Sequence, residues 1–178
     1  MKFNNTEISD LYLIEYDLFN DQRGSFLKTY NKELFKKNNL CCSFEESFYS
    51  VSNKNVFRGM HFQTPPFDHV KLINVIRGSI IDIVLDIRKD SLTYGKYIQF
   101  DLSENDSKGL YIGTGLAHGF YSKDNNTIVQ YHTSTVQDKD SESGIKWNSF
   151  GMKLNFENII ISDRDNNLPD FSTQTNHF

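Results

Sequence analysis

Short segments in which apolar and polar residues alternate dominate the middle of this chain. Alternation at a period of two is typical of β-strands that bury one face. The clearest segments span residues 71–78, 79–88, 95–103, 108–115, 118–123 and 126–134. Clusters of Gly, Asn, Asp and Ser separate them at intervals expected for an antiparallel sandwich or barrel. The pattern therefore predicts an all-β core over roughly residues 45–135.

Helical periodicity is weak by comparison. Residues 31–39 can form two helical turns with Asn31 as the N-cap. The N-terminal segment 8–26 is typical of strands joined by a turn. The serine and charge content of residues 134–144 predicts an exposed polar loop, and the chain after residue 155 is expected to be extended.

Length, charge and cysteine content narrow the possible functions. The 178 residues are most simply one domain, residues 1–178, with a core large enough to fold without covalent crosslinks. The net charge of -4, without a basic stripe, argues against nucleic acid and leaves room for a small anionic ligand. The two cysteines, Cys41 and Cys42, are adjacent and suit neither a metal site nor a disulfide framework. No apolar run approaches the roughly 20 residues of a membrane span, and none marks secretion, so a cytoplasmic location is expected.

Candidate chemistry is concentrated in "RGMHFQTPPFDHVKLINVIRG", residues 58–78. Its spacing resembles the first motif of cupin barrels, in which a His-x-His pair and a glutamate bind a metal. Here Gln63 replaces the second histidine and Lys71 replaces the glutamate. A lysine ammonium has no lone pair and repels a cation, which argues against a metal. His61 and Lys71 instead suit proton abstraction beside a carbonyl, although a lone histidine in a β-rich chain is more often a structural or surface residue.

Several motifs together extend the resemblance to one enzyme family. They are "FRGMHFQTPP", "VKLINVIRGSIIDIVLDIRKDSLTYGK", "GLAHGF", "GIKWN" and "IIISDRD". In this order they resemble the dTDP-4-dehydrorhamnose 3,5-epimerase family, from about Asp21 to Asp165. The resemblance implies a cupin-like jelly-roll domain with short peripheral helices, a site completed by a C-terminal extension, and a homodimer. It also implies an isomerase of deoxysugar and surface polysaccharide (O-antigen) biosynthesis that acts without a cofactor or metal.

The same resemblance implies roles for individual residues. His61 would remove a proton beside the C4 ketone of the sugar, and Asp165 would orient its imidazole. Lys71 would face the ketone oxygen, and Tyr131 would return a proton from the opposite face. The implied substrate-binding residues are Arg23, Arg58, Gln63, His118 and Asp82. Arg23 and Arg58 would bind the diphosphate, and a surface salt bridge is the alternative for either one.

Some positions depart from the family pattern. Glu46-Ser47-Phe48 stands where a Gln-Asp-Asn stretch usually meets the nucleotide, and Val136 and Gln137 replace two tyrosines. "IGTG" replaces "IPEG" before the "AHGF" motif. The identity of the nucleotide and sugar therefore stays open at this point.

Three classes of function are compatible with the sequence to different degrees. The first is an epimerase of a nucleotide-linked 4-keto-6-deoxyhexose, which could invert C3, C5 or both on a dTDP, CDP or GDP sugar. The second is a cupin that binds a sugar nucleotide without turnover, which would not need an acid and a base. The third is a metal-dependent cupin, which Gln63 and Lys71 oppose.

Overall fold

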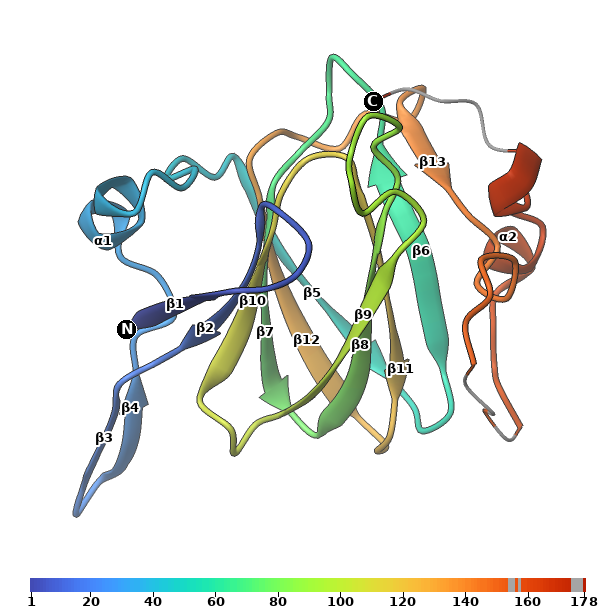
Figure 1. Cartoon of the computed structure of the whole chain (residues 1–178). Helices are drawn as coiled ribbons and strands as arrows, with labels where there is room; N and C mark the ends of the chain where they lie inside the picture. The colour runs from blue at the N-terminus through green and yellow to red at the C-terminus, as the bar shows by residue number, and fades with distance from the viewer. Residues whose placement is uncertain (154–155, 157, 174–177) are drawn as a thin grey trace.

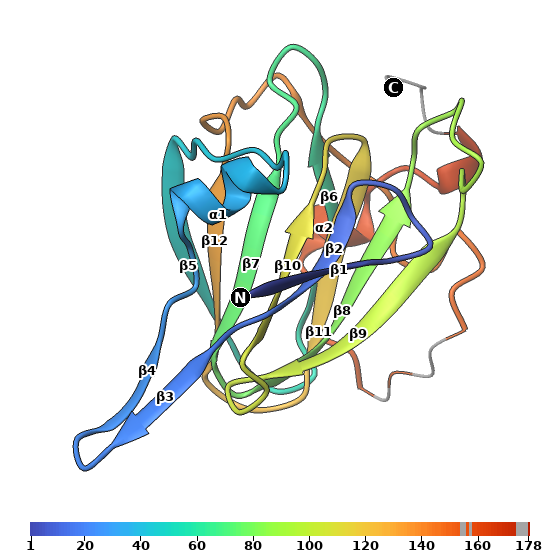
Figure 2. The ribbon, with the colours of Figure 1, turned by 60° about the vertical axis from the view of Figure 1, so that its left-hand side comes forward.

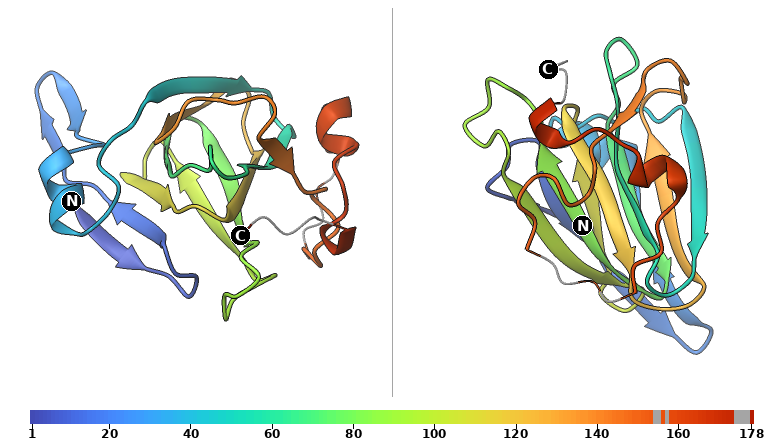
Figure 3. Two further views of the ribbon diagram at one scale, coloured as in Figure 1. Left: turned by 90° about the horizontal axis from the view of Figure 1, so that it is seen from above. Right: turned by 90° about the vertical axis from the view of Figure 1, so that its right-hand side faces the viewer.

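The computed structural model describes residues 1–153, 156, 158–173 and 178, and it consists mainly of two facing antiparallel sheets (Figures 1 and 3). The six-stranded sheet has the order β1 (Lys2–Asn5), β2 (Leu11–Glu15), β10 (Lys108–Ile112), β7 (Lys71–Arg77), β12 (Thr127–Thr133) and β5 (Glu46–Ser52). The five-stranded sheet has the order β13 (Glu142–Gly144), β6 (Phe57–Gln63), β11 (Leu116–Ser122), β8 (Ser79–Asp86) and β9 (Tyr97–Ser103). The predicted all-β, cupin-like jelly roll is therefore confirmed.

The six segments predicted from alternation are observed as strands β7 to β12. Strand β12 shows the expected period most clearly, because Thr127, Val129, Tyr131 and Thr133 are buried while the residues between them are only partly so. Alternate side chains of a strand point to opposite faces. The inner face of β12 therefore directs Tyr131 and Thr133 into the space between the two sheets.

The main core fills most of this space with aliphatic and aromatic side chains from both sheets. It includes Ile73, Val75, Val84, Leu110, Phe120 and Val129. Strand β7 is apolar on both faces, since its outer residue Leu72 packs in a second cluster with Phe35 of helix α1 (Lys32–Lys37). The side chain of Asn31 accepts hydrogen bonds from the first-turn amides of α1, so the predicted cap is confirmed.

The C-terminal segment covers the outer face of the five-stranded sheet, on the side of the barrel opposite α1 (Figure 1). The expectation of an extended segment was wrong for two parts of it, α2 (Asp163–Asn166) and the 3-10 turn η1 (Phe171–Thr173). Ser162 starts α2 because its hydroxyl accepts a hydrogen bond from the Asp165 amide. This single turn places Asp165 beside β6.

The sequence predicted that the polar segment 134–144 is an exposed loop. That prediction was wrong for part of the segment. Its last residues form β13, which pairs with β6 so that Gly144 lies opposite His61. Ser141 is buried, and its carbonyl oxygen accepts a hydrogen bond from the Thr64 amide. Backbone pairing with β6 thus outweighs the polar composition.

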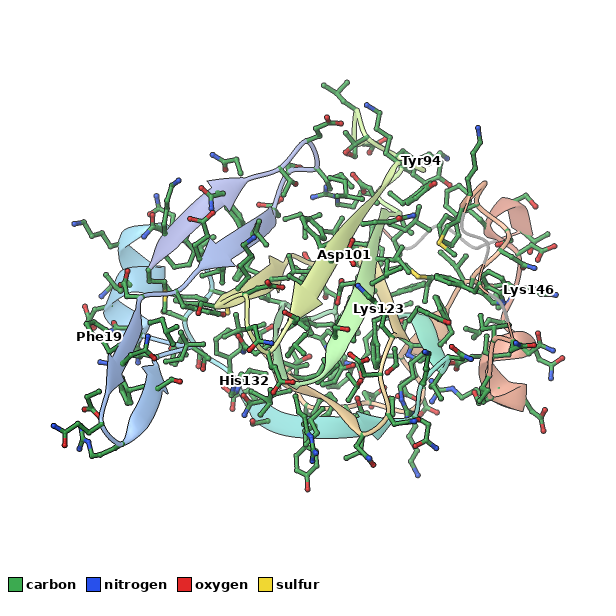
Figure 4. All side chains as sticks on the ribbon, turned by 90° about the horizontal axis from the view of Figure 1, so that it is seen from below. Phe19, Tyr94, Asp101, Lys123, His132 and Lys146 are labelled. Atoms are coloured by element: carbon green, nitrogen blue, oxygen red, sulfur yellow. The ribbon has the colours of Figure 1, made fainter. Side chains whose placement is uncertain are left out.

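A separate hairpin of β3 (Leu18–Asp21) and β4 (Gly24–Leu27) projects away from the barrel (Figures 1 and 2). Leu18, Phe19 and Phe26 are 45%, 62% and 60% exposed on it, and Figure 4 labels Phe19. Clusters of exposed large apolar side chains are typical of surfaces that contact another molecule.

None of the helices within the described residues is long and apolar enough to cross a membrane.

Candidate active site

A cavity of about 370 Å³ opens between the two sheets. Both walls contribute polar side chains to it. Of the residues predicted from the sequence, those that line it are Arg58, His61, Gln63, Lys71, His118, Tyr131 and Asp165. The structure therefore brings together all four predicted catalytic side chains from β6, β7, β12 and α2.

His61 and Asp165 form a hydrogen-bonded pair on the five-stranded wall. The imidazole Nε2 lies 2.8 Å from Asp165 Oδ1, and Asp165 Oδ2 accepts a hydrogen bond of 3.1 Å from the Gly59 amide. Burial opposes ionisation of Asp165, but these hydrogen bonds and the His61 charge hold its pKa below the usual value. An ionised Asp165 accepts a hydrogen bond from Nε2–H, which holds the proton on Nε2 and leaves Nδ1 with a lone pair.

Gly59 makes this arrangement possible because β6 and β11 approach closely at this point. Its φ of +135° is available mainly to glycine, and a Cβ there would lie 2.4 Å from the Gly119 Cα. A side chain at either glycine would push the two strands apart. The glycine of the "RGMH" motif therefore positions its neighbour His61.

Lys71 is the buried cation of the cavity. It extends from the six-stranded wall, and its Nζ donates a hydrogen bond of 3.0 Å to the backbone oxygen of His61 on the facing wall. Burial lowers its pKa to about 8, although the negative charges of Asp82 and Glu142 oppose the shift. Lys71 therefore remains largely an ammonium at pH 7.

Tyr131 lies on the six-stranded sheet, whereas His61 lies on the five-stranded sheet. Its ring stacks on Phe48 with centroids 4.9 Å apart, and it meets the edge of His118 at 6.1 Å. Burial raises the pKa of its phenol, so the group stays protonated at neutral pH. A protonated phenol and an imidazole thus come from opposite walls of one cavity.

His118 and Asp82 form a second histidine–carboxylate pair at 2.8 Å, deeper in the five-stranded wall. Asp82 was expected to line the pocket, but it is fully buried and is separated from the cavity by His118. It is linked to the site through that imidazole, and its negative charge acts on Lys71 and Tyr131.

The predicted substrate-binding residues differ in where they lie. Arg58 lines the cavity, and its guanidinium donates to the Ser52 hydroxyl and to the Val51 carbonyl oxygen. Arg23 does not line the cavity of its own chain. It lies in the turn of the β3–β4 hairpin, where its side chain is 89% exposed and pairs with Asp21 at 2.5 Å.

Gln63 lines the cavity, but its amide makes three hydrogen bonds to backbone groups. It donates to the Phe67 and Val136 carbonyl oxygens and accepts from the Asp138 amide. This side chain therefore holds the loops around the cavity, while one lone pair of its Oε1 stays available to a ligand.

Sequence reasoning did not identify several cavity residues. They are Ser50, His69, Thr133, Glu142, Ser143 and Arg164, with Arg164 paired to Glu142 at 3.1 Å. His69 had a readable signal, because it precedes Lys71 by two residues and should share its face of the strand. Arg164 had one too, since it adjoins Asp165.

Among the residues that the structure describes, no group of three or more His, Cys, Asp or Glu side chains could hold a metal ion.

Comparisons with known proteins place this geometry in a family context. The family described as dTDP-4-dehydrorhamnose 3,5-epimerase matches residues 5–173. The chain is 33% identical over 171 residues to the dTDP-4-dehydrorhamnose 3,5-epimerase of Methanothermobacter thermautotrophicus, covering 93% of this chain and 92% of the relative.

Solved structures agree with the sequence comparison. The dTDP-4-dehydrorhamnose 3,5-epimerase of Bacillus anthracis with TDP and PPi bound superposes with a TM-score of 0.91 at 35% identity, covering 95% and 98% of the two chains. The dTDP-6-deoxy-D-glucose-3,5-epimerase of Legionella pneumophila in complex with dTDP-4-keto-L-rhamnose gives 0.92 at 26% identity, covering 97% and 93%. Sequence and fold thus point to the same group of proteins.

Proposed function

The chain belongs to the dTDP-4-dehydrorhamnose 3,5-epimerase family, and we propose that it inverts C3, C5 or both of a dTDP-linked 4-keto-6-deoxyhexose in deoxysugar biosynthesis. One observation carries this proposal. A hydrogen-bonded imidazole and a protonated phenol enter one cavity from opposite sheets, with an ammonium between the walls. Inversion at carbon requires this arrangement, because one proton must leave one face while another arrives at the other.

His61 is the base. Its Nε2 is bound to Asp165, so Nδ1 accepts the proton from C3 or C5 of the sugar. The carboxylate fixes the tautomer and stabilises the imidazolium that forms. The electron pair of the broken C–H bond moves to the C4 oxygen, which becomes an enolate.

Lys71 stabilises that enolate. A buried ammonium near the developing negative charge is worth more than the same charge in water, because little solvent screens it. Its bond to the His61 backbone oxygen fixes the ammonium beside the base. Tyr131 then donates its proton to the carbon from the other wall, the enolate returns to the ketone, and solvent gives a proton to the phenolate and takes one from the His61 imidazolium.

The reaction needs no metal in this account. Lys71 provides the positive charge at the position where cupins carry a metal-binding glutamate, and Gln63 is held by backbone bonds. Activity should therefore survive EDTA. Loss of activity that returns on adding Fe(II), Mn(II) or Zn(II) would contradict this part of the mechanism.

The diphosphate is bound by Arg58 and, in a homodimer, by Arg23 from the partner. Arg23 lies on a hairpin with three exposed apolar side chains. Strand β5 forms an edge of the six-stranded sheet beside the cavity, where Phe48, Tyr49 and Val51 are also exposed. Packing the hairpin of one protomer against this edge of the other buries both apolar surfaces and brings an arginine to the cavity.

Mixing two inactive variants tests this dimer. An Arg23→Ala protomer has an intact cavity, and a His61→Ala protomer has an intact hairpin. Co-refolding the two should therefore restore activity at one site of each mixed dimer. If both variants stay inactive after mixing, or sedimentation shows a monomer, the shared site is wrong.

Proton NMR in D₂O tests the function itself. Incubation with dTDP-4-keto-6-deoxyglucose should bring deuterium to C3, C5 or both, with inversion at the same centres. Parallel reactions with the CDP- and GDP-linked sugars measure the selectivity for the nucleotide. Binding of the dTDP sugar without deuterium uptake would indicate a non-catalytic binding protein instead.

A further inference from the structure

His69 is a cavity residue for which the mechanism above has no role. It lines the cavity, and both of its ring nitrogens are shielded from solvent. Neither nitrogen has a hydrogen-bond partner among residues 1–153, 156, 158–173 and 178. Buried polar groups without partners are rare in folded proteins, because each costs free energy unless something satisfies it.

Backbone pairing fixes where His69 points. The Val70 amide donates to the Ser134 hydroxyl at 2.9 Å, and the Ser134 amide donates to the Val70 carbonyl oxygen at 3.1 Å. The pairing of β7 with β12 thus continues beyond Lys71, which lies opposite Thr133. His69 and Lys71, two residues apart, therefore share the inner face.

The imidazole is neutral at physiological pH. Burial, reinforced by the nearby Lys71 charge, lowers the pKa of His69 to about 3. A neutral imidazole offers one donor and one acceptor. That pair matches a hydroxyl group, which can also donate and accept, whereas a phosphate would need a cation.

The position along the cavity narrows the choice of hydroxyl. Arg58 lies near the start of β6, and Gln63 at its end reaches the Phe67 carbonyl oxygen next to the His69 segment. His69 thus lies toward the end of the cavity away from Arg58, adjacent to Lys71. In a 4-keto-6-deoxyhexose the only hydroxyl next to the ketone is on C3, since C5 carries the ring oxygen and the methyl group.

We propose that His69 is a substrate-binding residue whose neutral imidazole exchanges hydrogen bonds with the C3 hydroxyl of the hexose. The assignment rests on the proposed function, in which Lys71 binds the C4 oxygen. Two neighbouring side chains on one strand face then bind two neighbouring oxygens of the sugar. His69 thereby fixes which ring carbon faces His61.

The test combines His69→Leu with a substrate that lacks the C3 hydroxyl. Deuterium uptake at C5 is followed by proton NMR for dTDP-4-keto-6-deoxyglucose and for its 3-deoxy analogue. His69→Gln keeps a donor and an acceptor. His132→Leu is the matched control. His132, labelled in Figure 4, is a half-buried histidine on β12 that packs against Phe44 and does not line the cavity.

His69→Leu should lower kcat/KM for the complete substrate by roughly 3- to 10-fold, the worth of one neutral hydrogen bond. The loss should appear mainly in KM, because this bond exists before and during proton transfer. With the 3-deoxy analogue, His69→Leu and wild type should be equal. His69→Gln should retain most activity, and dTDP should bind all variants equally in calorimetry.

An equal loss with both substrates would mean that His69 only supports the fold, and no loss with either would mean that it makes no substrate contact. Either result overturns the assignment while leaving the proposed function intact. Absence of exchange at both C3 and C5 of the complete substrate in the wild-type enzyme would contradict the proposed function itself, and with it this assignment.

Discussion

Two histidine–carboxylate pairs have their histidines on adjacent strands of the same sheet, and they differ in what surrounds them. His61 and His118 are directly opposed on β6 and β11, and each Nε2 lies 2.8 Å from a carboxylate oxygen. The His61 side chain is 33% exposed, whereas the His118 side chain is only 4% exposed. Pair geometry alone therefore does not identify a catalytic base.

The partner carboxylates explain the difference. Asp165 comes from a one-turn helix outside the barrel, and its second oxygen is held by the Gly59 amide. Asp82 lies inside β8, and its second oxygen has no hydrogen-bond partner among the described residues. The outer pair orients an accessible base, while the inner pair supports the wall against the Tyr131 ring.

The largest difference between the two pairs is expected when each carboxylate is replaced by an amide and the rates of deuterium uptake are compared. Asp165→Asn should lower deuterium uptake at C3 and C5 by roughly 10²- to 10⁴-fold, because the imidazole loses its fixed tautomer. Asp82→Asn should lower it by less than about tenfold, since Asp82 does not contact the base.

The double variant His61→Ala/Asp165→Asn should be no slower than His61→Ala, since the two residues act as one unit. Equal losses for Asp165→Asn and Asp82→Asn would remove the distinction between the pairs.

Tyr131→Phe should separate abstraction from reprotonation. The base side remains intact, so solvent deuterium should still enter with retained configuration. Inversion should fall by roughly 10²- to 10⁴-fold, the usual worth of a positioned acid. NMR of the C3 and C5 protons measures both rates, and inversion at the wild-type rate would show that another group delivers the proton.

The pH dependence of kcat/KM should report the protonation state of Lys71, which lies between the two walls of the cavity. Its folded pKa is about 8, against 10.5 for an unperturbed lysine. If the ammonium stabilises the enolate, kcat/KM should fall about tenfold per pH unit above 8. A profile that stays flat to pH 9.5 would mean that the ammonium does not take part.

Stability should change in the opposite direction over the same range. The folded state binds fewer protons than the unfolded state between pH 8 and 10.5, so this group favours folding more as pH rises. Urea unfolding of wild type and Lys71→Met at pH 7.5 and 9.5 measures the difference. The free energy of unfolding of wild type, relative to that of Lys71→Met, should be higher at pH 9.5 than at pH 7.5.

Substitutions in the inner pair, His118 and Asp82, should have the smallest effect on catalysis. They should instead lower the free energy of unfolding. His118→Leu leaves the Asp82 carboxyl buried without its partner, at a cost of about 1–3 kcal/mol in the free energy of unfolding. Adding Asp82→Asn should recover part of that loss. Urea denaturation measures both, and an unchanged midpoint for His118→Leu would show that the pair does not stabilise the wall.

The sequence predicted the strands well because their buried faces alternate, and the cap of α1 because Asn31 has a local role. The four catalytic candidates followed from motif resemblance, and the fold brings them together. Hydrophobic patterning could not predict α2, since a single turn carries too little periodicity, or β13, whose pairing outweighs its polar composition.

The other differences between expectation and structure concern where residues lie relative to parts of the chain that are distant in sequence. The sequence does not specify that Asp82 lies behind His118, because both residues occupy buried strand positions with the same local pattern. It also does not specify that Arg23 lies outside the cavity of its own chain, since a hairpin that folds inward and one that projects have the same turn sequence.

The most direct test of the account measures deuterium uptake at C3 and C5 from D₂O for His61→Ala and His118→Ala side by side, under saturating substrate. We predict that His61→Ala abolishes uptake at both carbons while still binding dTDP, and that His118→Ala retains uptake. Uptake near the wild-type rate in His61→Ala, with loss in His118→Ala, would make the buried pair the base and contradict the account.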